Sequence, residues 1–239
     1  MFKADSARVA RKRLALLTIA WLAIALAPEL SAHGVSGKDA IFLQSIRGAA
    51  IGPLMYLGAK HMVTGYDHLA FLVGVIFFLY RMKDVVEYVS LFTIGHSATL
   101  LLGVLGGIRA NPYVVDAIIG LSVVYKAFDN IDGFRSFFGF QPNARAAVLL
   151  FGLFHGFGLA TKLQDFALSP NGLVTNIVSF NVGVEMGQML ALTFILIGLT
   201  WWRTRPGFLR HSFMTNTLLM TGGFLLVGYQ LSGYMLSTK

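Results

Sequence analysis

The chain has 239 residues, of which 56% are hydrophobic and 13% charged, and its mean hydropathy is +0.68. Soluble domains contain about 25% charged residues, so this composition excludes a water-soluble globular domain and predicts that lipid surrounds most of the fold. The formal net charge of +8 does not indicate nucleic-acid binding, because the basic residues lie between apolar stretches, as in membrane proteins. Cysteine is absent, which excludes disulfides and thiolate metal ligands.

The first 32 residues are typical of a targeting segment. Basic residues precede an apolar run over residues 14–27, which is too short to span a bilayer comfortably, and the small residues Ser31 and Ala32 follow. We therefore expect a cleaved signal peptide over residues 1–32 and a single transmembrane helical domain over residues 33–239. The alternative is an uncleaved anchor.

The next segment, residues 38–60, has an amphipathic pattern. Apolar residues recur at helical spacing opposite Lys38, Gln44 and Arg47, which favours a helix lying in the outer membrane interface. The alternative is a spanning helix, which would invert the topology of everything after it.

Six apolar stretches follow, and we expect an all-α, polytopic membrane helical bundle with about six transmembrane helices. Their approximate ranges are 66–80, 85–105, 112–130, 144–161, 174–202 and 213–236. The first is short, so we expect it to extend backward into the preceding segment.

Basic residues in the loops predict the orientation. The outer loops after the first span hold only Arg109 and Lys162. The inner loops hold Arg81, Lys83, Arg135, Arg145, Arg203, Arg205 and Arg210. By the positive-inside rule, the mature N-terminus is periplasmic and the membrane is the bacterial inner membrane.

Ionisable side chains within the predicted spans point to a metal. Each costs a few kcal/mol in hydrocarbon, so such residues are rare without a role. Several imidazoles together with one or two carboxylates form a ligand set for a borderline divalent cation. The predicted metal ligands are His61, Asp67, His68, His96, His155 and Glu185. Taken singly, a histidine in such a span could equally hydrogen-bond a neighbouring carbonyl.

Further polar residues are predicted to support these ligands. Ser97, Asn181 and Asp129 are candidates for holding ligands in place. Asn181 is also suited to joining helices by a hydrogen bond. Asp129 has the helical i, i+3 spacing to Lys126 that indicates a structural ion pair.

Glycines surround two of the predicted ligands. Gly152 and Gly156 lie beside His155, and Gly183 and Gly187 flank Glu185. Small residues allow helices to approach closely, so this pattern predicts that the backbones around His155 and Glu185 lie near each other.

Four stretches together resemble the HupE/UreJ family. They are residues 61–68 (HMVTGYDH), 92–100 (FTIGHSATL), 151–160 (FGLFHGFGLA) and 179–188 (SFNVGVEMGQ). The resemblance implies a small inner-membrane protein that is associated with hydrogenase and urease gene clusters and acts as a nickel permease or nickel-handling accessory. It also implies metal contact at the two histidines and the aspartate of the first stretch, and at the histidine of the third.

The chain resembles a divergent branch of that family. Better-studied members carry a glutamate shortly after the His-Gly of the third stretch, whereas this chain continues from Gly156 to Phe157 and Gly158. Glu185, on the next predicted span, is the nearby glutamate that remains as a candidate.

Three functions are compatible with these patterns. The leading hypothesis is a secondary permease, facilitator or handling protein for a divalent metal ion, with Ni²⁺ preferred and Zn²⁺ or Co²⁺ as alternatives. In that hypothesis, His61, Asp67 and His68 capture the ion at the outer mouth and pass it to His96, His155 and Glu185. The second is an intramembrane zinc-dependent hydrolase, in which three histidines with an aspartate and Ser97 hold a zinc ion and activate its water. The third is a non-catalytic subunit of a membrane complex, and a partner in hydrogenase or urease maturation is compatible with the first and third.

Overall fold

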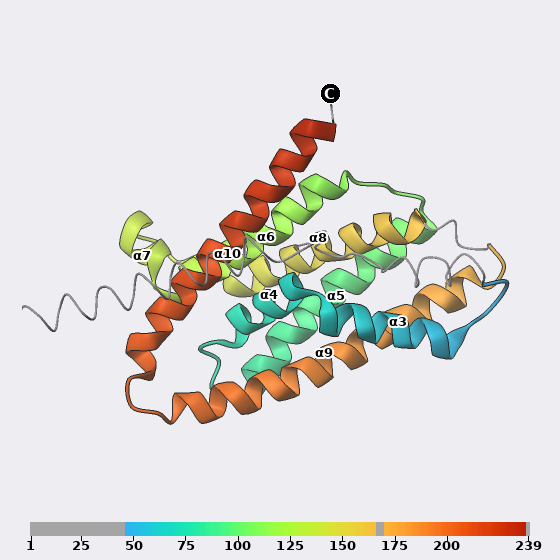
Figure 1. The fold of residues 1–239 in the computed structure, drawn as a ribbon. Helices are drawn as coiled ribbons and strands as arrows, with labels where there is room; N and C mark the ends of the chain where they lie inside the picture. Colours follow the sequence, from blue (N-terminus) through green and yellow to red (C-terminus); the bar gives the residue numbers. More distant parts are fainter. Residues whose placement is uncertain (1–45, 166–169, 238–239) are drawn as a thin grey trace, which may run out of the picture. The chain divides into compact units, whose positions relative to one another are not determined.

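The computed structural model describes residues 46–165 and 170–237, and within these ranges the protein is all-helical (Figure 1). The helices are α3 (Ile51–Thr64), α4 (Tyr66–Ile76), α5 (Met82–Leu105), α6 (Pro112–Asn130), α7 (Gly133–Phe138), α8 (Ala144–Gln164), α9 (Leu173–Arg203) and α10 (Phe208–Ser237). The predicted signal peptide lies outside the described residues.

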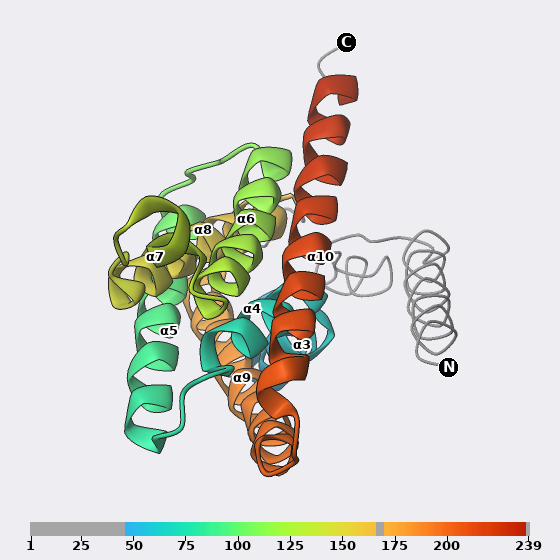
Figure 2. The same cartoon turned by 90° about the vertical axis from the view of Figure 1, so that its left-hand side faces the viewer.

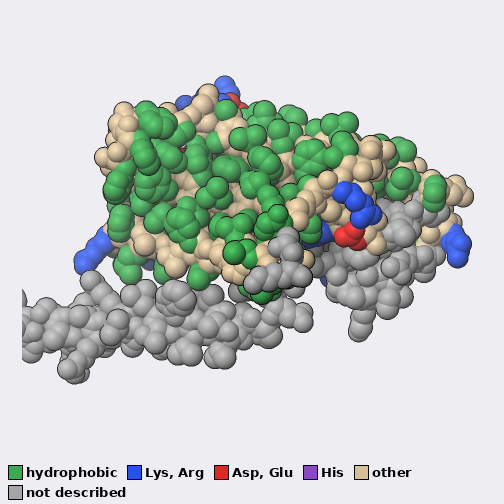
Figure 3. Space-filling model, turned by 90° about the horizontal axis from the view of Figure 1, so that it is seen from above, with side chains coloured by type: hydrophobic (Ala, Val, Ile, Leu, Met, Phe, Trp, Pro, Cys, Tyr) green, Lys and Arg blue, Asp and Glu red, His purple; other side chains and the backbone are tan. Residues whose placement is uncertain are grey.

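The helical membrane fold predicted from the sequence is confirmed. Among the described helices, α5, α8 and α9 are long and apolar enough to cross a membrane, whereas α4 is apolar but short. Large hydrophobic side chains on outward faces remain exposed, including Phe194, Ile197 and Trp201 on α9. Figure 3 shows hydrophobic side chains over most of the face in view, with basic side chains at its margins. The chain is therefore a multi-pass membrane protein.

Helix α3 runs parallel to the first half of α9 (Figure 1). A Cβ atom added to Gly183 would lie 2.0 Å from the Met55 carbonyl oxygen, and one added to Gly187 would lie 2.6 Å from that of Ala59. At the beginning of α3, the amide of Ala50 donates a hydrogen bond to Asn176 Oδ1 over 2.8 Å. Because three successive contacts keep the same order in both helices, α3 lies along α9.

Helix α4 continues in the same direction to the end of α9. The guanidinium of Arg203, the last residue of α9, donates to the carbonyl oxygens of Ile76, Phe77 and Leu79. Ile76 ends α4, Phe77 caps it and Leu79 follows, so Arg203 donates where helix carbonyls need outside donors. Helices α3 and α4 therefore form one path beside α9, interrupted at Gly65.

Part of the predicted interfacial helix over residues 38–60 lies within the described residues. Residues 46–50 are not helical, and from Ile51 onward the chain runs along α9, which is itself long enough to span. The backbone of α3 packs against the glycines of α9, and α3 and α4 run in the same direction along it.

The remaining helices form two further close pairs. Helices α5 and α8 run parallel, since Gly152 meets the Phe92 backbone and Gly156 meets that of His96. Helices α6 and α10 run antiparallel, because Gly120 meets Gly223 and Val227 while Tyr113 meets Gly233 (Figure 2).

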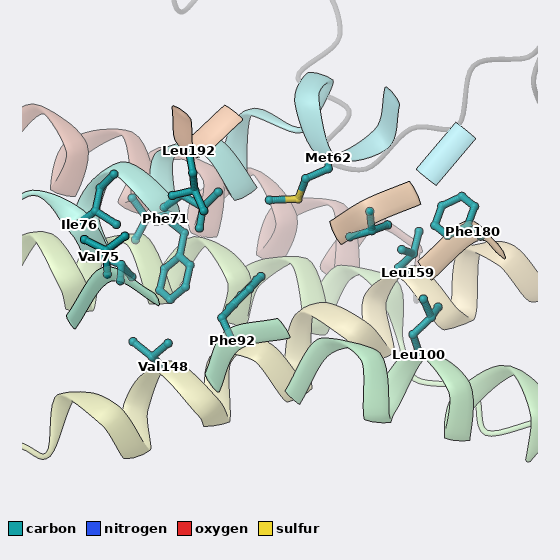
Figure 4. Close-up of a cluster of buried hydrophobic side chains, with 14 of the residues drawn as sticks. Met62, Phe71, Val75, Ile76, Phe92, Leu100, Val148, Leu159, Phe180 and Leu192 are labelled. Carbon is teal, nitrogen blue, oxygen red and sulfur yellow. The ribbon is translucent and has the colours of Figure 1, made fainter. Parts of the chain in front are cut away.

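Aromatic and aliphatic side chains fill the space between the helix pairs. Phe71 of α4, Phe92 of α5 and Phe180 of α9 are almost completely buried (Figure 4). The ring centroids of Phe71 and Phe92 are 5.3 Å apart, within the range for favourable aromatic pairs. This core surrounds the polar residues that the sequence analysis singled out.

Candidate metal centre

Three of the predicted ligands gather around the ring of a fourth, His68. Its centroid lies 4.9 Å from that of His155, 5.3 Å from that of His61 and 6.0 Å from that of His96. The four imidazoles come from α3, α4, α5 and α8. Residues that are up to 94 positions apart in the sequence thus form one compact group, which we call the histidine cluster (His61, His68, His96 and His155).

The histidine cluster is buried. The exposed fractions are 0% for His68 and His155, 2% for His96 and 9% for His61, and the Nε2 atoms of all four are buried. Imidazole binds a metal ion in its neutral form, through the lone pair of one ring nitrogen. Of the four, His61 is the most accessible.

Hydrogen bonds orient two of the rings. His155 Nδ1 lies 2.8 Å from the Phe151 carbonyl oxygen, which can only accept a hydrogen bond. Nδ1 therefore carries the proton, and Nε2 holds the lone pair. The His68 amide donates to Asp67 Oδ1 over 2.9 Å, and the same oxygen lies 3.3 Å from His68 Nδ1. Asp67, which is 5% exposed, thus orients the central imidazole.

Close packing of α5 against α8 brings His96 and His155 together. A Cβ atom on Gly156 would lie 2.2 Å from the His96 carbonyl oxygen, and one on Gly152 would lie 2.4 Å from that of Phe92. Thr99 Oγ1 also donates to the Leu153 carbonyl oxygen over 2.7 Å. The glycines predicted to join α8 to α9 instead join α8 to α5, while Gly183 and Gly187 join α9 to α3.

The interruption at Gly65 brings His61 next to His68. In a continuous helix, residues seven apart lie about 10 Å from each other along the axis, too far for ring contact. Here their ring centroids are 5.3 Å apart. His61 and His68, the predicted capture residues, therefore lie in one cluster with His96 and His155, the predicted transfer residues.

The other predicted site residues have different surroundings. Glu185 is half-buried on α9, with its neighbours Asn181 and Gln188 directed toward α5. Asn181 Nδ2 lies 2.9 Å from Ser97 Oγ, so this pair joins α5 to α9. Asp129 is paired with Lys126 in the predicted ion pair, and Gln141 also donates to it.

The histidine cluster does not form a closed metal site in this conformation. Within the described ranges, no three His, Asp or Glu side chains are arranged so as to hold a metal ion. The rings stand edge to face, with interplanar angles of 73–76° between His68 and its three neighbours. Rotations of these rings would therefore have to accompany binding.

Two structural contributions were not predicted from the sequence. Arg203 was counted only as an inner-loop charge, yet it caps α4 and stacks on the Tyr80 ring at 4.6 Å. Lys162 was counted as an outer-loop charge, yet it lies within α8 and its Nζ is 2.9 Å from Asp116 Oδ2 on α6. The helical spacing of Lys162 from the apolar residues before it could have indicated that it lies within α8.

Comparison with known proteins identifies the chain. Searches of curated proteins and of solved structures returned no match. The family described as HupE / UreJ protein matches residues 37–238, nearly the whole chain and all four stretches on which the resemblance was based. The chain therefore belongs to the HupE / UreJ protein family.

Proposed function

We propose that this protein is an inner-membrane secondary permease, facilitator or handling protein for a divalent transition metal, with Ni²⁺ as its preferred cargo. Family membership implies a nickel- or cobalt-related accessory or permease role. The observation that carries the proposal is the convergence of four buried imidazoles, from four helices, around His68.

The chemistry of the cluster suits such a cargo. Imidazole nitrogen binds Ni²⁺, Zn²⁺ and Co²⁺ well, and the lack of cysteine disfavours soft Cu⁺. The ion would meet His61 first, since this ring is the most exposed, and would then reach His68, whose orientation Asp67 fixes. A site that needs ring rotations to close can also release its ion, which transport requires.

The proposed topology places the mature N-terminus in the periplasm. The first crossing consists of α3 and α4, followed by α5, α6, α8, α9 and α10. The relative directions of the helix pairs support this count. Asp129 belongs to the inner ion pair, so we assign it a structural role. Ser97 is engaged with Asn181, and this engagement gives the hydrolase hypothesis no support.

Metal binding and uptake by the same variants test the proposal. We would purify the full chain in mild detergent, titrate it with Ni²⁺, Co²⁺ and Zn²⁺, and measure Ni²⁺ uptake into proteoliposomes. His68→Ala and His155→Ala are expected to weaken Ni²⁺ binding by at least about tenfold, because losing even a residue that only supports a ligand lowers metal affinity by about that factor. Glu185→Ala shows whether this carboxylate is also a ligand.

The matched control is His211→Ala, which removes an exposed imidazole on α10 outside the histidine cluster. It should leave binding and uptake unchanged. One stoichiometric, chelator-resistant zinc would favour the hydrolase instead. Failure of the wild-type protein to bind any of the three ions would refute the proposal and favour a non-catalytic subunit.

A further inference from the structure

The interruption between α3 and α4 lies in the middle of the fold. Residues 49 to 79 accompany α9 from Gly172 to Arg203, and Gly65 falls near the centre of this path. A chain that crosses a membrane has its backbone hydrogen bonds satisfied most simply by a continuous helix. Interruptions at membrane depth are tolerated where they form binding sites. The position of Gly65 therefore calls for an explanation.

The backbone conformation of Gly65 does not require glycine. Its φ is −75° and its ψ is 99°, in the extended region that any L-residue adopts readily. By contrast, Gly172 has a φ of 78°, which does favour glycine. The reason for glycine at position 65 must therefore be space.

The space at Gly65 is occupied by the central pair of the site. A Cβ atom there would lie 3.0 Å from the His61 carbonyl oxygen, 3.1 Å from His68 Nδ1 and 3.3 Å from Asp67 Oδ1. All three contacts are tighter than ordinary Cβ contacts. The methyl group of alanine would thus press on the two atoms that orient the imidazole of His68.

Both half-helices are held firmly on either side of Gly65. Helix α3 is fixed to α9 by the Gly183 and Gly187 contacts and by Asn176, and α4 is fixed by Arg203. Neither half can retreat freely from an added side chain. The displacement would therefore fall on the side chains of Asp67 and His68.

We infer that Gly65 is a positioning residue of the metal centre: the absence of a side chain there leaves the room in which Asp67 sets the orientation of His68. This inference rests on the proposed metal-binding function. It assigns Gly65 no direct contact with the ion. It predicts that metal affinity depends on the size of residue 65 rather than on the continuity of the helix.

A size series separates these two explanations. In the full chain, Gly65→Ala is expected to weaken Ni²⁺ binding about tenfold, as loss of support for a ligand does, and Gly65→Val more strongly. If helix continuity mattered instead, alanine would be more damaging than valine, because alanine is the better helix former. The matched control is Gly52→Ala in α3, where a Cβ atom would meet nothing within 4 Å.

The visible absorption spectrum of bound Co²⁺ supplies a readout that a general loss of stability would not move. We expect it to change in Gly65→Ala at saturating Co²⁺ and to match wild type in Gly52→Ala. Wild-type affinity and spectrum in Gly65→Ala, a greater loss with alanine than with valine, or failure of Gly65→Ala to fold would each overturn the inference. Absence of metal binding by the wild-type protein would instead refute the proposed function itself.

Discussion

Replacing Gly156 with alanine is expected to separate α5 from α8 at the level of the histidine cluster. The new Cβ atom would lie 2.2 Å from the His96 carbonyl oxygen and 2.1 Å from Thr99 Oγ1, whereas real Cβ atoms are essentially never closer than 3.0 Å. The carbonyl belongs to a helix backbone and cannot rotate away. The two helices must therefore move apart by about 0.8 Å, the difference between these distances.

The expected loss of stability is about 1–3 kcal/mol. Overpacking of a tight interface costs about 1–3 kcal/mol. Loss of the hydrogen bond from Thr99 to the Leu153 carbonyl oxygen costs about another 1 kcal/mol. The greater helix propensity of alanine over glycine returns about 1 kcal/mol. The opposing contributions leave a net destabilisation comparable to the overpacking alone.

Unfolding in mixed micelles by titration with SDS, followed by far-UV circular dichroism, measures this loss. Gly198→Ala is the matched control, because this α9 glycine has nothing within 4 Å of an added Cβ atom. The control should be as stable as wild type or more stable by up to about 1 kcal/mol. Ni²⁺ affinity should fall in Gly156→Ala alone, since His96 and His155 move apart.

Equal stability of the Gly156→Ala and Gly198→Ala variants would refute this reasoning. It would mean that α5 and α8 do not approach through their glycines. Loss of stability with unchanged Ni²⁺ affinity would have a different meaning. The close approach would then be correct, but the spacing of His96 and His155 would not determine binding.

Two further predictions concern residues around the cluster. Asn181→Ala should cost about 0.6 kcal/mol in the same SDS titration, typical for a hydrogen bond between transmembrane helices, while leaving Ni²⁺ affinity unchanged; a tenfold affinity loss would make Asn181 a support of the site after all. Arg203→Met should cost about 2 kcal/mol, because charged donors to the carbonyls of α4 are lost. Arg203→Lys should fall between this variant and wild type, and a lysine variant no better than methionine would argue against the cap.

The helices, and the polar residues that gather among them, could be predicted from the sequence for identifiable reasons. Apolar stretches long enough to span lipid indicated α5, α8 and α9. Charged and imidazole groups inside such stretches are costly, so their presence indicated His96 and His155 before any fold was known. The family resemblance implied metal contact at His155 as well.

The partners of the glycines could not be predicted. A small residue indicates that another backbone comes close. The spacing of the small residues along the sequence, however, is the same whichever helix approaches. Gly183 and Gly187 therefore gave no information on whether α8 or α3 would fill the groove. The interruption at Gly65 could not be predicted either, because the apolar character of the chain continues through it. A continuous helix would keep the His61 and His68 rings apart, whereas in the structure they are in contact.

The path of α3 and α4 depends on a part of the chain that is synthesised much later. Asn176 accepts a hydrogen bond from Ala50, which lies 126 positions earlier in the sequence. Arg203 caps the end of α4 from a similar distance along the sequence, 124 positions from Leu79. When α3 and α4 leave the ribosome, neither half has its α9 groove or its cap, and each is shorter than a membrane is thick. The histidine cluster can therefore assemble only after α9 has been synthesised. A chain that stops before Leu173 would carry all four histidines of the cluster without the scaffold that gathers them.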